Sequence, residues 1–197
     1  MHIDVDTLLA YGATPKEWHK GELIFSQGND ARYFHQIDTG MVKMTSLTND
    51  AKEFIQGVFN DGNSFGEPAL MIGKPYPASA FAVSHSVIYR LSKEKFLLLL
   101  EDHPSLFKKL FYIFCDRLYC KSLTANILVN NSPEEKLIGF FDKIKSECKL
   151  NESGFVPYTR QQLADYTGLR VETVIRTLSK LADKKIVTIQ DHKVYYR

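Results

Sequence analysis

The chain has 197 residues, enough for one domain or for two small domains that each bury a core of their own. Its composition is 44% hydrophobic and 24% charged, which excludes a disordered chain. Basic and acidic residues nearly cancel, at 25 against 23, but from Pro133 onward 12 basic residues face 9 acidic ones. This bias supports nucleic-acid binding only weakly, because an ordinary solvated surface carries the same charge.

The cysteines and the apolar stretches indicate the cellular compartment of the protein. Cys115, Cys120 and Cys148 are too few for a disulfide framework and form no Cys-x-x-Cys pair, which favours a reducing cytoplasm. Residues 1–13 lack the regions of a signal peptide, and the densest apolar stretch, 106–118, carries four charges. We therefore expect a cytoplasmic protein that neither enters nor spans a membrane.

Residues 21–91 have the pattern of a small β domain. Seven glycines punctuate short runs of β-branched and aromatic residues. The runs predict strands at 22–25, 41–44, 54–59 and 87–91, and such spacing is typical of a sandwich or barrel. We expect residues 4–18 to form a short helical lead-in.

The pattern becomes helical after Ser92. Residues 92–95 open a short helix, and a long helix follows from Pro104 to about Val129. Apolar residues along it form one stripe: Phe107, Leu110, Phe111, Phe114, Leu118 and Ala125. A rod of about 40 Å is too long for one small β domain to cover. We expect a second copy of the chain to cover the stripe; the alternative is a helix folded back on its own barrel.

A domain boundary is expected just before Pro133. Ser132, Pro133 and Glu135 match a helix cap, a first-turn proline and a capping box, so a new helix begins here and runs to near Lys149. The predicted domains are a β domain with its lead-in, a long helix with a hinge, and a C-terminal domain: residues 1–103, 104–131 and 132–197.

The last 40 residues predict two short helices and a hairpin. Thr159 and Gln162 match a capping box, and Gly168 stands where a helix end needs a left-handed residue. A second helix, from about Val171 to Asp183, has an apolar and a polar face. A short hairpin follows it. The combination is typical of a winged helix-turn-helix, and an ordinary helical hairpin with a solvated outer face is the alternative.

The segment from Thr159 to Leu181 resembles the winged helix-turn-helix of the catabolite-activator (Crp/Fnr) family of bacterial transcription regulators, and Phe65-Gly66-Glu67 resembles the family's effector-pocket motif. The resemblance implies an α+β fold: an N-terminal double-stranded β-helix (a jelly-roll-like β-roll) that senses an effector, a long dimerisation helix, and the winged helix-turn-helix. It also implies a homodimer without enzymatic activity that binds a pseudo-palindromic site in double-stranded DNA, with RNA polymerase as a further partner.

The resemblance assigns base reading to Glu172 and Arg176, which match the family's E-T-V-x-x-R motif. A carboxylate accepts from the cytosine amino group, and a guanidinium binds O6 and N7 of guanine. The alternative is an intrahelical ion pair between the two residues. Val171 and Ile175 would meet thymine methyl groups, and Arg170 would meet a phosphate. The expected DNA-contacting residues are Thr159, Arg160, Arg170, Val171, Glu172, Thr173, Ile175, Arg176, Ser179 and Lys180.

The effector pocket departs from the cyclic-nucleotide-binding members. There a Glu holds the ribose hydroxyl and an Arg holds the cyclic phosphate; here Glu67 is present, but Ala78 stands at the arginine position. We therefore expect an effector other than cyclic AMP, with Lys74 or Lys121 as candidates to replace the missing charge. The expected pocket residues are Phe65, Gly66, Glu67, Pro68, Ala69, Ala78, Ser79, Lys121 and Ser122.

No cofactor or metal is expected. Residues 1–56 hold none of the clustered cysteines of the iron-sulfur branch, and the histidines are isolated in the sequence. Cys115 and Cys120 do not share a helical face, so packing is favoured over a redox role. Two other functions stay open. One is a cupin-like metalloenzyme, although its His-x-His pair is missing; the other is a cyclic-nucleotide-binding-type module that regulates a protein partner.

Overall fold

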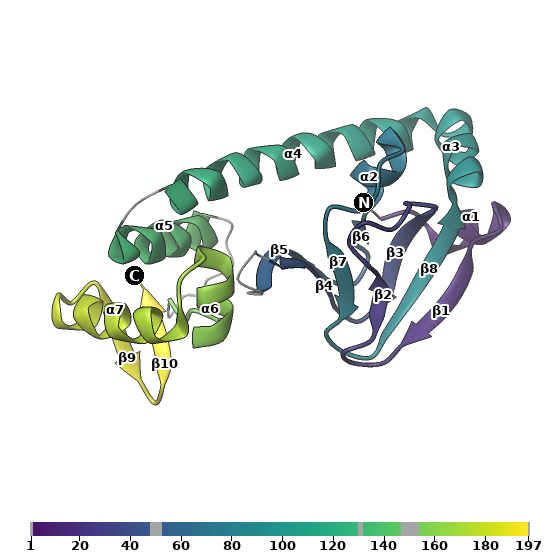
Figure 1. Cartoon of the computed structure of the whole chain (residues 1–197). Helices are drawn as coiled ribbons and strands as arrows, with labels where there is room; N and C mark the ends of the chain where they lie inside the picture. The colour runs from purple at the N-terminus through teal and green to yellow at the C-terminus, as the bar shows by residue number, and fades with distance from the viewer. Residues whose placement is uncertain (1, 48–52, 130–131, 147–153, 197) are drawn as a thin grey trace. The chain divides into compact units, whose positions relative to one another are not determined.

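The computed structural model describes residues 2–47, 53–129, 132–146 and 154–196. The chain divides into two compact units, Met1–Arg117 and Leu118–Arg197 (Figure 1). In the described part of the chain, none of the helices combines the length and the apolar character that a membrane crossing requires.

The first unit is built on two antiparallel sheets of four strands each. One sheet has the order β1 (Thr14–Trp18), β8 (Ser86–Ser92), β3 (Tyr33–Thr39), β6 (Ser64–Phe65). The other has the order β2 (Leu23–Phe25), β7 (Ser79–Ala82), β4 (Val42–Leu47), β5 (Glu53–Phe59). Buried residues of both sheets, among them Ile37, Ile88, Val42 and Ala80, share one core. The predicted β domain is therefore confirmed as two packed sheets.

The helical lead-in is shorter than predicted. Helix α1 spans only Val5–Ala10, where the carboxylate of Asp4 accepts from the backbone N of Thr7 at 3.2 Å. The prediction for Thr14–Trp18 was wrong, because these residues form β1 and pair with β8 in antiparallel register. Pairing with a strand some 70 positions later in the chain overrides the local pattern.

Three helices complete the first unit and lead out of it. Helix α2 is Glu67–Ile72, helix α3 is Lys93–Asp102, and helix α4 is Pro104–Val129. The hydroxyl of Ser92 caps α3 by accepting from the backbone N of Lys95 at 3.4 Å. A second core lies under α1, α3 and the start of α4, with Leu8, Phe34, Leu99 and Leu110 among its buried members.

Helix α4 has an inward and an outward apolar face, and this corrects the single predicted stripe. Leu110 is 1% exposed and belongs to the core of its own chain, and Phe114 packs against that core. Phe107, Phe111 and Leu118 instead expose 52%, 59% and 68% of their surface. Around the helix axis Leu110 lies roughly 60° to 100° from these three side chains, and Phe114 lies between them and Leu110. One side of the helix is therefore packed within its own chain, whereas these three side chains are exposed.

The second unit holds the C-terminal elements: α5 (Pro133–Ser146), α6 (Arg160–Thr167), α7 (Val171–Asp183), β9 (Val187–Gln190) and β10 (Lys193–Tyr196). One apolar core joins them, with Leu137, Leu163, Leu178 and Val194 contributed by α5, α6, α7 and β10. Asp191 and His192 form the hairpin turn. Both have positive φ, as a two-residue type I′ turn requires. The predicted end of α5 near Lys149, together with Cys148, lies outside the described residues.

Candidate nucleic-acid interface

Local hydrogen bonds set the relation between α6 and α7. The backbone N of Gln162 donates to the hydroxyl of Thr159 at 3.1 Å, and the backbone N of Thr159 donates to the Gln162 side chain at 2.8 Å. This is the predicted capping box. Gly168 ends α6 with a φ of 66°, the left-handed conformation predicted for it. Only three residues, 168–170, separate the end of this helix from Val171, so α7 starts from a tight turn.

Helix α7 is divided sharply into a buried and an exposed face. Val174, Leu178 and Leu181 are buried in the core of the unit. On the other side Glu172, Ile175, Arg176, Ser179 and Lys180 are exposed, and Ile175 exposes 50% of its surface. Among the residues that the structure describes, Glu172 and Arg176 form no ion pair with each other. Their charged groups therefore remain available to an external ligand.

The other predicted DNA-contacting residues lie around this face. Thr159 is exposed at the cap of α6, Arg160 is half-buried in its first turn, and Arg170 is exposed at the start of α7. Thr173 is half-buried. Val171 is also half-buried and packs against the core, so only part of its side chain is open to a partner.

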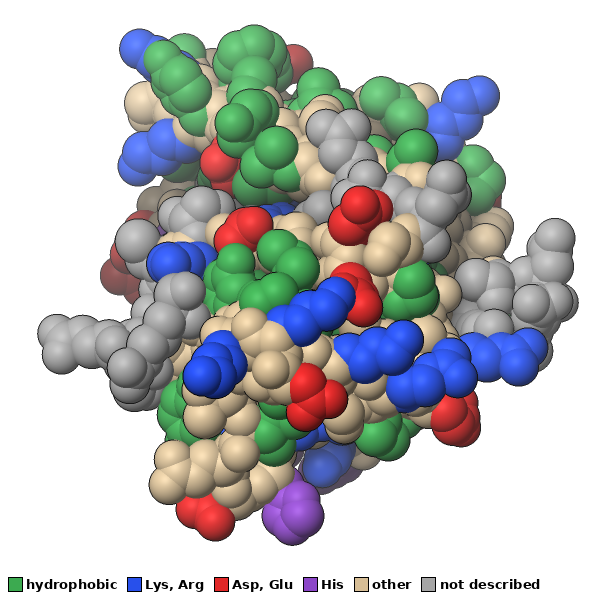
Figure 2. Space-filling model, turned by 90° about the vertical axis from the view of Figure 1, so that its left-hand side faces the viewer, with side chains coloured by type: hydrophobic (Ala, Val, Ile, Leu, Met, Phe, Trp, Pro, Cys, Tyr) green, Lys and Arg blue, Asp and Glu red, His purple; other side chains and the backbone are tan. Residues whose placement is uncertain are grey.

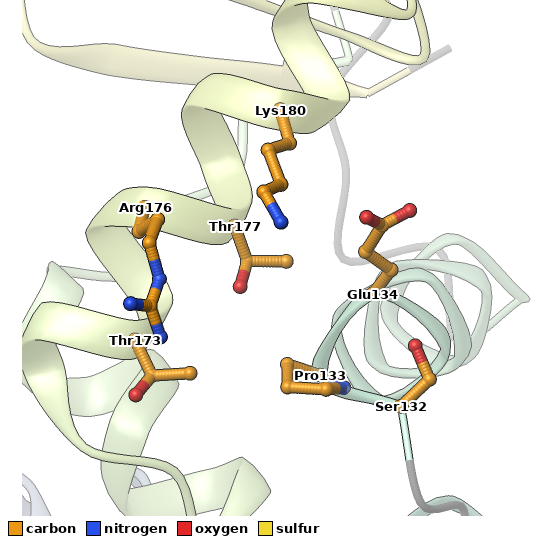
Figure 3. Close-up of a pocket in the computed structure, with 7 residues that line it drawn as sticks. All are labelled: Ser132, Pro133, Glu134, Thr173, Arg176, Thr177 and Lys180. Carbon is orange, nitrogen blue, oxygen red and sulfur yellow. The ribbon is translucent and has the colours of Figure 1, made fainter.

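A cavity of about 340 Å³ lies between α7 and the beginning of α5 (Figure 3). It is lined by Ser132, Pro133, Glu134, Thr173, Arg176, Thr177 and Lys180. The ammonium of Lys184 lies 2.5 Å from the Glu134 carboxylate, and with the charge of Lys180 it lowers the pKa of Glu134. Arg176 and Lys180 thus line a cavity together with an acidic residue, Glu134, that already forms an ion pair with Lys184. The α5 lining of this cavity is not evident from the sequence, because it depends on how α5 packs on α7.

Basic side chains extend across this side of the molecule. Figure 2 views the side that carries α7 and the hairpin, where several Lys and Arg side chains lie near one another in a band, with single Asp and Glu side chains among them. The polyanionic backbone of DNA favours such a surface.

The effector motif lies in the interior of the first unit. Gly66 begins α2 with a φ of 80°, and a Cβ on it would lie 3.0 Å from the Tyr76 ring. Phe65, Glu67 and Ala78 are each 0% exposed. Tyr76 stacks on Phe25 with ring centroids 3.7 Å apart, so aromatic rings fill the space beside the motif.

Glu67 forms an ion pair with Arg117, a partner that the sequence did not predict. Arg117 on α4 donates from Nη1 to both carboxylate oxygens, at 3.0 and 3.3 Å, and from Nη2 to the carbonyl of Ser64 at 2.7 Å. Burial and the negative charge of Glu67 raise the pKa of Tyr76. The available sequence signal was a basic residue inside an apolar helix.

The remaining predicted pocket residues are scattered. Pro68 is exposed, Ala69 is buried, and the hydroxyl of Ser79 accepts from the backbone N of Gln27 at 2.9 Å. Lys74 is exposed. Lys121 and Ser122 lie on the part of α4 that belongs to the second unit, and both are exposed there.

The fold brings together histidines that are distant in the sequence. The rings of His19 and His85 have centroids 5.6 Å apart, and the His85 Nε2 lies 3.5 Å from a carboxylate oxygen of Glu17. Even so, across the described residues no group of three or more His, Cys, Asp or Glu is suited to hold a metal ion.

Two protein-family models match the chain. Residues 15–103 match the cyclic nucleotide-binding domain, and residues 135–196 match the Crp-like helix-turn-helix domain. The two matches span most of the sequence, with α4 between them.

Named relatives and solved structures agree with these matches. The chain is 26% identical over 172 residues to the transcriptional activatory protein AadR of Rhodopseudomonas palustris, covering 85% of this chain and 71% of the relative. It is 26% identical over 165 residues to the nitrogen fixation regulation protein FixK of Bradyrhizobium diazoefficiens, covering 82% and 68%. The structure of the cyclic di-GMP responsive global regulator CLP of Xanthomonas campestris shares the fold, with a TM-score of 0.81 at 18% identity, covering 98% of this chain and 97% of that one.

Proposed function

The chain is a DNA-binding transcription regulator of the Crp/Fnr family, and from this premise we propose that it acts as a homodimer that reads a pseudo-palindromic site through Glu172 and Arg176. The observation that carries the proposal is the exposed face of α7, where these two charged groups stand unpaired beside Ile175. Arg176 suits a guanine and Glu172 a cytosine, so a G·C pair in each half-site is the expected target.

The homodimer proposal is supported by the outward face of α4. Phe107, Phe111 and Leu118 lie within about 40° of one another around the helix axis and are more than half exposed. Apolar surface of this kind is stabilised by a partner that removes it from water. A two-fold dimer through α4 covers the same patch on both copies.

The roles of the flanking residues follow from their chemistry. We assign Arg170 and Lys180 to backbone phosphates, because a single exposed cation binds a phosphate without reading sequence. Thr159 and Arg160 at the start of α6, and Thr173 and Ser179 on α7, complete the proposed contact set. The cavity between α5 and α7 gives Arg176 and Lys180 room to reorient on binding.

The effector proposal concerns the first unit. We propose that the β-roll does not respond to cyclic AMP, since Ala78 offers no cation for the phosphate and Glu67 is already paired with Arg117. The regulator of Xanthomonas campestris is described as responsive to cyclic di-GMP, and that nucleotide belongs in the same test. We place the protein in the cytoplasm, with RNA polymerase as its further partner and no catalytic activity of its own.

Selection of bound sequences from a pool of random duplex DNA tests the proposal. The expected product is an inverted repeat whose half-sites lie about one helical turn, 10 to 10.5 base pairs, apart. Enrichment of one unpaired half-site contradicts the dimer. Retention without enrichment of any sequence contradicts base reading.

A further inference from the structure

The Glu67–Arg117 pair joins α2 to α4 in the interior of the first unit. The side chain of Glu67 is 0% exposed and that of Arg117 is 27% exposed. The guanidinium also lies over the Phe59 ring, with its Cζ 5.2 Å from the ring centroid. Arg117 therefore contacts α2, β5 and the carbonyl of Ser64 at once.

A fully buried carboxylate needs such a partner. Removing one member of a buried ion pair leaves the other charge without water and without a counter-ion, which is strongly destabilising. Among the described residues of the first unit, Arg117 is the basic side chain that forms an ion pair with Glu67. The carboxylate and the guanidinium are therefore bound to each other whenever α4 lies on the β-roll.

The pair also sets the position of α4 along its axis. Leu110 lies in the core of the unit, and Arg117 follows it two turns later on the same side of the helix. The apolar contact and the ion pair are thus separated by about 10 Å along the helix. Sliding α4 by one residue would break the bidentate geometry, because charge-assisted bonds of this kind are directional.

We propose that the Glu67–Arg117 pair takes the place of a bound effector: it fixes α4 on the β-roll without a small molecule, so the protein binds its DNA site in the absence of any ligand. A ligand hydroxyl aimed at Glu67 has to displace a guanidinium, and the Tyr76 and Phe25 rings occupy the space beside Gly66. The proposal rests on the proposed function, in which α4 carries the dimer contact and leads to the DNA-binding unit.

The first experiment uses the full-length protein freed of small molecules by unfolding in guanidinium chloride and refolding. Binding to the selected duplex is measured by fluorescence anisotropy, alone and with cyclic AMP, cyclic GMP or cyclic di-GMP. We expect equal affinities within twofold. If the stripped protein loses affinity and a low-molecular-mass cell extract restores it, the inference is wrong and the regulator function stands. If it binds no DNA with or without extract, the DNA-binding proposal fails as well.

The second experiment tests the pair itself with Glu67→Gln, Arg117→Gln and the double variant. We expect each single variant to increase amide hydrogen exchange in α4 up to residue 117 and to weaken DNA binding about tenfold, and the double variant to be no worse than either single one. The matched control is Arg32→Gln, which breaks an exposed pair with Asp30 in the same unit.

Two outcomes contradict the inference: wild-type DNA affinity in all three variants, or additive losses in the double variant. If a single variant fails to fold, the double variant, which buries no unpaired charge, is compared with the wild type alone: a loss of about tenfold in DNA affinity supports the inference, and wild-type affinity contradicts it.

Discussion

Glu172 and Arg176, both in the described part of the chain, lie one turn apart on the exposed face of α7 and form no ion pair with each other. An i,i+4 pair of this kind would contribute only a few tenths of a kcal/mol to the helix. A guanine that accepts two hydrogen bonds from Arg176 would contribute roughly 1 to 3 kcal/mol. The two side chains are therefore better suited to bind DNA than to bind each other.

Replacing Arg176 with Ala is expected to remove base preference at one position of each half-site. The lost bidentate contact corresponds to roughly 1 to 3 kcal/mol per half-site. Fluorescence anisotropy against the selected site and against single-base variants of it measures the effect. An equal loss of affinity for selected and scrambled DNA would mean that Arg176 contacts the backbone.

Lys180→Ala and Arg170→Ala provide the contrasting case. Both are expected to weaken all DNA sequences alike and to reduce the slope of log affinity against log salt by about one per phosphate contact. Titrations at several salt concentrations measure this slope. A change of base preference in either variant would assign it to base reading instead.

Leu118→Glu is expected to split the dimer, since it would bury an unpaired charge at the centre of the outward face of α4. Sedimentation should show the wild type near 45 kDa, twice the chain mass of 22.6 kDa, and the variant as a monomer. Ser105→Glu is the matched control, because it makes the same change of charge at an exposed position on the other side of the helix. A monomeric wild type at micromolar concentration would refute the proposed dimer.

His35 is expected to make folding sensitive to mild acid. It is buried against the rings of Phe25 and Phe65, and burial, with the charge of Arg90, lowers its pKa to about 3. Above pH 6.5 the ring is neutral in both states. Below it only the unfolded chain takes up the proton, so stability falls as the pH falls.

The expected loss due to His35 is about 2 kcal/mol between pH 6.5 and pH 4.5. Denaturant unfolding at both pH values measures it, and His35→Asn should lose that much less than the wild type over the same interval. Parallel pH dependences in the two proteins would show that the ring is protonated in the folded state.

Local hydrogen bonds and hydrophobic periodicity determine one part of this structure, and contacts between distant residues determine the other. The helix ends at Ser92, Thr159 and Gly168 were predictable, because a cap or a left-handed turn is formed by hydrogen bonds among residues a few positions apart. The amphipathic helix α7 was also predictable from local sequence, because its hydrophobic periodicity extends over 13 consecutive residues. The family resemblance then supplied the function of that face.

Contacts between distant residues were decided only by the tertiary structure. Local pattern could not show that Thr14–Trp18 pairs with β8, that Leu110 turns inward while Phe111 turns outward, or that Arg117 reaches Glu67 across 50 positions. Each of these contacts depends on which surfaces the folded chain buries together. A buried charge or the unpaired backbone of a strand then bonds to the partner that packing brings near it. The sequence alone therefore determined the helix-turn-helix and its exposed residues, whereas the fold determined what lies opposite Glu67.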